Sequence, residues 1–163
     1  MDKKFWFASA VYEGRIHFQV QVTVNSGWIT EVIHGVEKTV DATSFEGIAL
    51  PGFIDTHCHG GGGYFFSDHE DKNIESIAKF HLMNGTTTLF ASLVTENREN
   101  LKSQVGRLGA LLPLSTIAGI HLEGPWLSTK FNGAHDSSLL RAPDLSEVTE
   151  LFNASNESLV SVT

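Results

Sequence analysis

From residue 50 onward, short β-rich apolar runs alternate with longer stretches whose apolar residues recur at helical spacing. This alternation predicts strands over residues 53–59, 86–94 and 116–122, and the start of a fourth strand over 159–163. Repeated strand–helix units are typical of a parallel sheet covered by helices, so we assign this part of the chain to the α/β class. The pattern alone allows either an open doubly wound sheet or a closed barrel.

Three helices are expected between these strands. The first carries an apolar face formed by residues 74–81 and ends at Gly85, and the second has a stripe over residues 101–112 that Pro113 ends. The third begins at Asp144, with Glu147 completing a capping-box-like pair. Its inward-facing residues are expected to be Leu145, Val148 and Leu151.

In residues 1–49 the apolar residues follow a different spacing. Apolar residues alternate with polar ones from Phe18 to Val24, and Asn25-Ser26-Gly27 is typical of a hairpin turn before the next apolar run. We therefore expect a small antiparallel sheet without catalytic residues, and two domains, residues 1–49 and residues 50–163.

Composition narrows the class of partner. The 163 residues carry a formal net charge of −8, which argues against nucleic acid or an anionic membrane surface as the main partner. Cys58 is the single cysteine, so an internal disulfide is excluded, which suits the cytoplasm. No apolar run approaches the ~20 residues that a membrane span needs, so we expect no membrane association.

The sequence Asp55-Thr56-His57-Cys58-His59 closes the first of these strands. Side chains alternate between the faces of a strand, so His57 and His59 share one face with Asp55, and Cys58 points the opposite way. Two imidazoles at this spacing can converge on one metal ion, and parallel sheets place their sites at the carboxyl ends of strands. The glycines 60–63 that follow are expected to form a sharp turn beside such a site.

The third predicted strand supplies a carboxylate to the same edge of the sheet. Glu123 ends the run Ile120-His121-Leu122-Glu123, where it could join the metal centre. His121 lies two residues earlier on the same face, and we expect it to be a buried supporting histidine rather than a direct ligand.

A long connection, residues 124–142, separates this strand from the next helix, whereas such connections usually have ~2–6 residues. It contains an Asn132-Gly133 turn, and His135 and Arg141 are candidate substrate contacts. Long loops on the carboxyl side of a sheet commonly bind ligands.

Four segments together resemble a known family. They occur in the order LPGFIDTHCHGGGG, GTTTLFASLVT, AGIHLEGPWLS and GAHDSSLL, and they are similar to the N-acetylglucosamine-6-phosphate deacetylases of the amidohydrolase superfamily. The resemblance implies hydrolysis of N-acetylglucosamine 6-phosphate to glucosamine 6-phosphate and acetate. It also implies that the chain is the N-terminal part of a (β/α)8 TIM-like barrel, preceded by part of a small β-sandwich.

The resemblance also assigns site residues. Glu123 corresponds to the family's metal-binding glutamate, and His57 and His59 to the additional ligand pair of members with two metal ions. Ala134 and His135 correspond to the substrate-facing loop. The implied cofactor is a divalent metal, Zn or Fe, as one or two ions, and the implied partners are an amino-sugar phosphate and, at full length, a second copy in a homodimer.

Not every element of the family is found within these residues. A barrel needs ~250 residues, of which residues 50–163 supply fewer than half. The resemblance places two further metal-binding histidines and the catalytic aspartate on later strands, so we expect no catalytic aspartate in this chain and no activity from it alone. The alternatives are a non-catalytic fragment that binds metal or a complementary chain, and another amidohydrolase such as a cyclic amidase or a deaminase.

Overall fold

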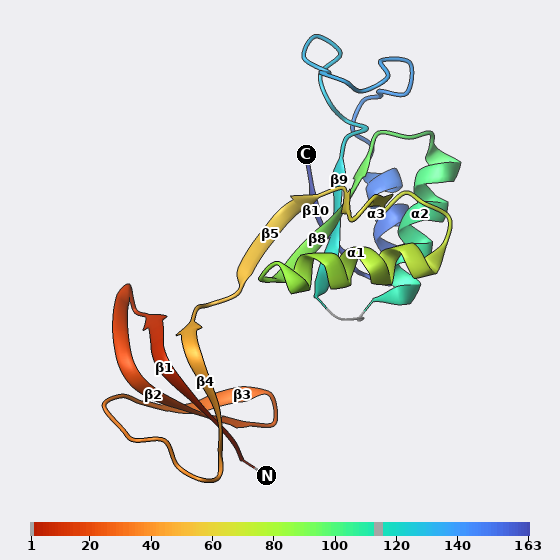
Figure 1. Cartoon of the computed structure of the whole chain (residues 1–163). Coiled ribbons are helices and arrows are strands. Elements are labelled where there is room, and N and C mark those ends of the chain that lie inside the picture. Colours follow the sequence, from red (N-terminus) through yellow and green to blue (C-terminus); the bar gives the residue numbers. More distant parts are fainter. Residues whose placement is uncertain (1, 113–115) are drawn as a thin grey trace. The chain divides into compact units, whose positions relative to one another are not determined.

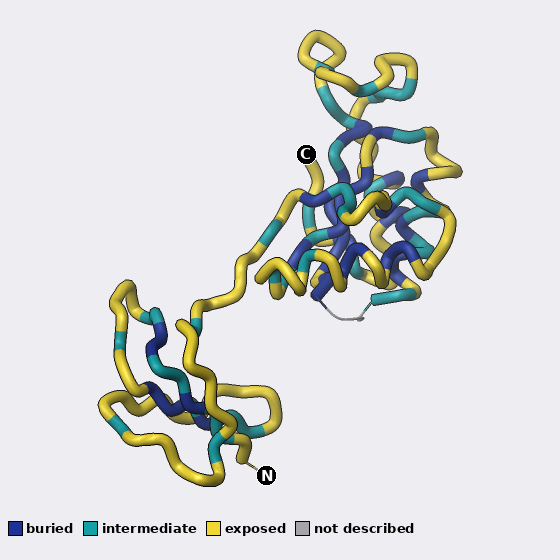
Figure 2. The backbone as a smooth tube through the Cα atoms, in the orientation of Figure 1, coloured by how far each residue is buried: buried dark blue, intermediate teal, exposed yellow. Residues whose placement is uncertain are grey.

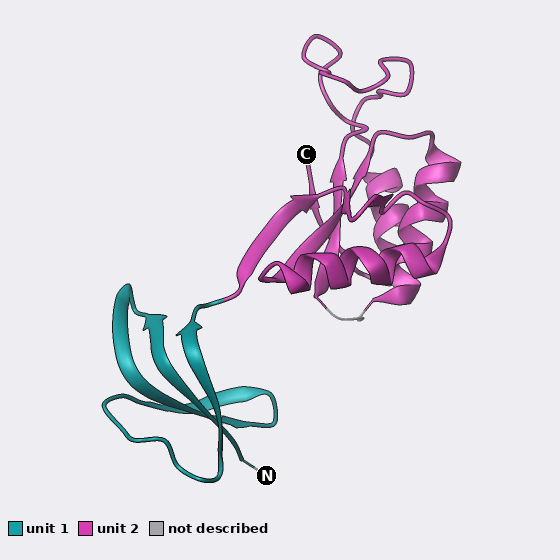
Figure 3. Ribbon diagram, in the orientation of Figure 1, with its two compact units in different colours: residues 1–51 teal, residues 52–163 magenta. Residues whose placement is uncertain are grey.

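The computed structural model describes residues 2–112 and 116–163, which form two compact units, residues 1–51 and 52–163 (Figures 1 and 3). The predicted helix stop at Pro113 lies outside the described residues. Within them, no helix combines the length and apolar character that crossing a membrane requires.

The first unit is a four-stranded sheet in the order β3-β2-β1-β4 (Figure 1). Its strands are β1 (Lys3–Tyr12), β2 (Arg15–Asn25), β3 (Trp28–Ile33) and β4 (Ala42–Ala49). The predicted turn joins β2 to β3 through Ser26 and Gly27, both with positive φ, as a two-residue hairpin requires.

The expectation of a purely antiparallel sheet is wrong. Strands β1, β2 and β3 pair antiparallel, but β4 pairs parallel to β1. A parallel neighbour needs a connection longer than a hairpin, and residues 34–41 supply it. The described residues of this unit form one sheet, with no second sheet packed on it.

The second unit is built from strand–helix repeats. All its long strands run parallel in the order β10-β9-β8-β5, and the helices lie beside this sheet (Figure 1). The strands are β5 (Phe53–Cys58), β8 (Thr86–Val94), β9 (Ile117–Glu123) and β10 (Leu159–Val162). Each new strand adds to the same edge, so these strands contain no reversal of the kind that defines a doubly wound sheet.

Three helices connect these strands: α1 (Asp71–Met83), α2 (Arg98–Leu111) and α3 (Leu145–Ala154). The end of α1 follows the sequence signal, since Asn84 caps it and Gly85 follows with φ +93°. The core lies where the helices pack on the sheet, along the segments coloured as buried in Figure 2. Its fully buried members include Ile77, Leu89, Leu101, Leu108, Ile120 and Leu151.

The start of α3 differs from the prediction. The side chain of Asp144 accepts a hydrogen bond from Ser146 N, but Glu147 is buried and binds Arg141 instead of closing a capping box. Leu145 is 81% exposed, whereas Leu151 is fully buried. Positions 147 and 151 are one turn apart and share the inner face, and position 145 lies nearly opposite them.

Candidate metal centre

The carboxyl end of β5 positions the two histidines of the H-x-H motif. The backbone N–H of His57 donates to the Asp55 carboxylate over 3.0 Å, which fixes the chain just before the pair. Cys58 is buried between two partly exposed histidines. The Nε2 atoms of His57 and His59 face one another at 3.0 Å.

Glu123, the last residue of β9, joins this pair. Its Oε2 atom lies 2.9 Å from His59 Nε2 and 3.3 Å from His57 Nε2. The three atoms form a nearly equilateral triangle, and one ion at roughly 2.0–2.2 Å from each can sit just outside its plane. The structure thus brings together the three residues that the sequence proposes as metal ligands.

The hydrogen bonds around His59 favour a cation at this point. Its Nδ1 atom lies 3.1 Å from the Ser92 carbonyl oxygen, which can only accept, so Nδ1 carries the proton. In the neutral ring, Nε2 then presents a lone pair to the Glu123 carboxylate and to His57. Lone pairs facing one another need a proton or a metal ion between them, so this donor set fits a divalent cation.

The Glu123 carboxyl is held in its charged form. Burial alone would raise its pKa, but the hydrogen bond and charge of His57, together with His59 and His135, outweigh burial and lower the pKa below 4.5. An ionised carboxylate is the form that ligates a metal.

His121 supports the centre from behind. It is 3% exposed; its Nδ1 lies 2.9 Å from the Ser92 hydroxyl and its Nε2 lies 2.9 Å from the Thr163 hydroxyl. Its ring meets that of His57 edge to face, with centroids 4.7 Å apart. Burial, then the neighbouring His57, lower its pKa, so the neutral ring is favoured.

The long connection after β9 returns to the centre through His135. The Asn132-Gly133 turn forms as expected: Gly133 has φ +56° and His135 N donates to Asn132 O. His135 Nδ1 lies 2.7 Å from the Thr95 hydroxyl, and its Nε2 lies 3.7 Å from Glu123 Oε1. The imidazole is thus held at the edge of the triangle.

A cleft of about 560 Å³ opens between this loop and the metal-binding triangle. Its lining includes both predicted loop residues and two of the three predicted ligands: Ala134, His135, His59 and Glu123. A ligand held there would lie against the metal centre on one side and the loop on the other.

Arg141 does not face this cleft as a free substrate contact. Its guanidinium donates to both carboxylate oxygens of Glu147 and to the carbonyl oxygens of Glu96 and Leu139. It therefore fastens the end of the loop to α3 and to the segment after β8.

The glycines after His59 form a tight hairpin. Strands β6 (Gly60–Gly61) and β7 (Tyr64–Phe65) pair antiparallel through Gly62 and Gly63, both with positive φ. A Cβ on Gly60 would meet Tyr64 O at 2.1 Å, so this turn requires glycine.

Ser92 and Thr95 are site residues that the sequence reasoning missed. Both are buried polar residues at the carboxyl end of β8, and they hold His59, His121 and His135. Their signal was a serine within the apolar second half of the strand, residues 89–94, and a threonine directly after it.

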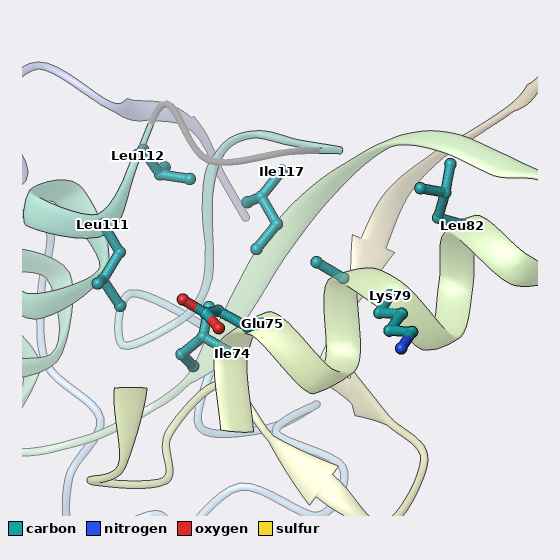
Figure 4. A pocket seen from close by; sticks show the side chains of 8 residues that line it. Ile74, Glu75, Lys79, Leu82, Leu111, Leu112 and Ile117 are labelled. Atoms are coloured by element: carbon teal, nitrogen blue, oxygen red, sulfur yellow. The ribbon is translucent and has the colours of Figure 1, made fainter. Parts of the chain in front are cut away.

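An apolar cleft of about 350 Å³ lies at the other end of the sheet, between α1, the end of α2 and Ile117 at the start of β9 (Figure 4). Its side chains are mostly aliphatic, with Glu75 and Lys79 from α1. It is remote from the histidine–carboxylate triangle and offers few polar groups to orient a ligand.

Comparisons with known proteins show which family this chain resembles. A model of the amidohydrolase family matches residues 48–163. The N-acetylglucosamine-6-phosphate deacetylase of Bacillus subtilis is 30% identical over 144 residues, and the N-acetylgalactosamine-6-phosphate deacetylase of a Shewanella strain is 26% identical over 146. These alignments cover 80% and 82% of this chain, but only 35% and 36% of the relatives.

A solved structure gives the same result. A variant of N-acetyl-D-glucosamine-6-phosphate deacetylase from Mycobacterium smegmatis, in complex with N-acetyl-D-glucosamine-6-phosphate, superposes with a TM-score of 0.85 and 34% identity. The match covers 99% of this chain and 42% of that one. The chain thus spans less than half the length of the proteins that it matches. With the family model covering more than half of its residues, the chain belongs to the amidohydrolase family.

Proposed function

We propose that these residues supply the metal-binding histidine pair, the metal-binding glutamate and the substrate loop of an N-acetylglucosamine-6-phosphate deacetylase. The observation that carries the proposal is the triangle of His57, His59 and Glu123 beside a cleft lined by Ala134 and His135. The names of the Bacillus subtilis relative and the M. smegmatis structure support the same substrate class.

The fold proposal goes with it. We propose that β5, β8, β9 and β10 are the first four strands of a (β/α)8 barrel, because they add in sequence to one edge without reversal. Residues 1–49 would form part of a β-sandwich: the sheet leaves an apolar cleft of about 390 Å³, lined by residues such as Phe5, Val22 and Ile29. An apolar sheet face of this kind needs a second layer.

In the reaction that we propose, each residue has a limited task. When bound, a divalent ion would lower the pKa of water and polarise the acetamide carbonyl. His57, His59 and Glu123 would hold it, and His135 would place an N–H donor near the acetamide oxygen. Thr95 and Ser92 would orient the imidazoles. The histidine and carboxylate ligands suit Zn or Fe, as one or two ions.

Three further parts belong to this proposal. The enzyme would work in the cytoplasm as a homodimer at full length. Residues 1–163 alone would not turn over substrate, because the resemblance places the catalytic aspartate and two more histidines outside them. Since one group of relatives acts on the galactosamine phosphate, the 4-epimer is a second candidate substrate.

A chimera tests the proposal. Residues 1–163 would replace the matching segment of the M. smegmatis deacetylase. Acetate release would be measured from both N-acetylated amino-sugar 6-phosphates and from the unphosphorylated sugar, and ring opening would be measured for a cyclic amide. We expect activity on a 6-phosphate that is lost in E123Q. A folded, metal-loaded chimera that prefers the cyclic amide would refute the proposed substrate class.

A further inference from the structure

A second cluster of metal-ligating atoms lies on the opposite side of β5. Cys58, at the end of that strand, directs its Sγ atom towards α1, where His81 approaches it from the helix. Cys58 is buried, and the Gly60 carbonyl of the hairpin faces the same point. None of these atoms belongs to the triangle of His57, His59 and Glu123.

The distances within this cluster suit one small ion. Cys58 Sγ lies 3.2 Å from His81 Nε2 and 3.3 Å from the Gly60 carbonyl oxygen, and Nε2 lies 3.0 Å from that oxygen. Zinc bonds of roughly 2.0–2.3 Å to all three atoms place the ion about 1 Å outside their plane, which leaves a fourth position open.

Asp55 lies close enough to be the candidate for that fourth position. One of its carboxylate oxygens lies within 4.8 Å of both Cys58 Sγ and His81 Nε2. The pairing of β5 with β8 shifts register between Asp55 and Cys58, so strict alternation of faces breaks there. A thiolate and a carboxylate together carry two negative charges, which balance a divalent cation.

We propose that Cys58, His81, Asp55 and the Gly60 carbonyl form a second metal site, separate from the histidine–glutamate centre, for a divalent ion that prefers thiolate and imidazole ligands, such as Zn²⁺. Binding forms the metal–sulfur bond and releases the thiol proton to solvent. The ion would join β5, the glycine hairpin and α1. This site is independent of the proposed deacetylase function.

The hairpin leaves room for this arrangement only because of its glycines. A Cβ on Gly61 would lie 2.7 Å from His81 Nε2, so any larger residue would displace the imidazole. Without an ion, the same atoms can hold the hairpin by hydrogen bonds to the Gly60 carbonyl. The two arrangements differ in whether sulfur bonds a metal, which spectroscopy measures directly.

The test uses Co²⁺ and Cd²⁺ as probes on the 163-residue chain, with a phosphine reductant. A thiolate-to-metal charge-transfer band should rise as metal is added to the wild-type chain, and it should saturate at one equivalent in the H57N/H59N double variant, which lacks the histidines of the first centre. It should disappear in C58S, and in H81Q it should need at least ten times more metal. Circular dichroism checks the fold of each variant.

Three results would overturn the proposal. The first is a wild-type chain that shows no such band at saturating metal, which would leave only the hydrogen-bonded arrangement. The second is an unchanged titration in H81Q, which would mean that the thiol binds the probe without the imidazole. The third is loss of the band in H57N/H59N, which would assign the sulfur to the first centre.

Discussion

The Oε2 atom of Glu123 lies 2.9 Å from Nε2 of His59, although 64 residues separate them along the chain. This contact exists because β5 and β9 both pair in parallel with β8, so their carboxyl ends meet at one edge of the sheet. The proposed metal centre depends on this arrangement, because its ligands come from the carboxyl ends of these two strands.

Glu123 is expected to control metal affinity at this centre. In E123Q, the carboxylate beside the two imidazoles becomes a neutral amide. Mutating a residue that only supports a metal ligand typically lowers metal affinity about 10–100-fold, and we expect the loss of Zn²⁺ affinity in E123Q to be at least as large. The Zn²⁺ affinity is measured by competition with a chelator. Each variant is made in a chain that also carries C58S, so that the second cluster does not contribute. Glu99, exposed on α2, gives the control E99Q, which should bind as before. Equal affinity in E123Q and E99Q would remove Glu123 from the ligand set.

Ser92 is expected to stabilise the centre's supporting histidine. The S92A change leaves Cys58 N and His121 Nδ1 without their hydroxyl partner, and a buried unpaired polar group costs about 1–3 kcal/mol. Urea unfolding measures the loss. S76A removes a hydroxyl on the exposed face of α1 and should change the free energy of unfolding by less than about 0.5 kcal/mol. Similar values for both variants would contradict this role.

The buried pair Arg141–Glu147 should matter more than an exposed pair of the same kind. R141A leaves the Glu147 carboxylate, 3% exposed, without its partner, and we expect a loss of about 3–5 kcal/mol in the free energy of unfolding. The matched control is R98A, which breaks the exposed Arg98–Glu150 pair and should cost about 0–1 kcal/mol. A small effect of R141A would show that the loop is fastened by other contacts.

The same pair predicts a pH dependence of stability. The hydrogen bond and charge of Arg141 outweigh burial and lower the pKa of Glu147 in the folded chain. The unfolded chain therefore binds the proton more readily. Stability from this group is fully present above the ordinary pKa of 4.5 and is lost as the pH falls towards the lowered value. Unfolding measured from pH 7 to pH 3 should show a shallower decline in E147Q, and parallel curves would contradict the assignment.

Two glycines of α2 should respond oppositely to alanine. A Cβ on Gly109 would lie 2.0 Å from the backbone oxygen of Ser155, so G109A must push α2 and α3 apart and should destabilise by at least about 1–3 kcal/mol. At Gly106 the nearest atom, Ala154 O, is 3.5 Å away, so G106A should stabilise by up to about 1 kcal/mol through helix propensity. Thermal unfolding compares the two, and destabilisation by both would show that the helices cannot accommodate either methyl group.

Local sequence signals determined much of this molecule. The strand over residues 86–94, the turn at Ser26-Gly27 and the end of α1 at Gly85 follow from short-range preferences, since side-chain alternation and positive φ depend on neighbouring residues. The spacing of His57 and His59 likewise sufficed to propose a metal-binding pair, because residues two apart on a strand share a face.

Tertiary structure decided what depends on distant segments. The parallel pairing of β4, the exposure of Leu145 and the bonding of Arg141 to Glu147 each depend on which element lies nearby, and local pattern does not carry that information. For the same reason, the sequence identified the candidate ligands but not the Ser92 carbonyl that holds His59, nor the hydroxyls of Ser92 and Thr95 that hold the neighbouring His121 and His135. A hydrogen bond between strands requires a register, and the register is set only when the whole sheet packs against its helices.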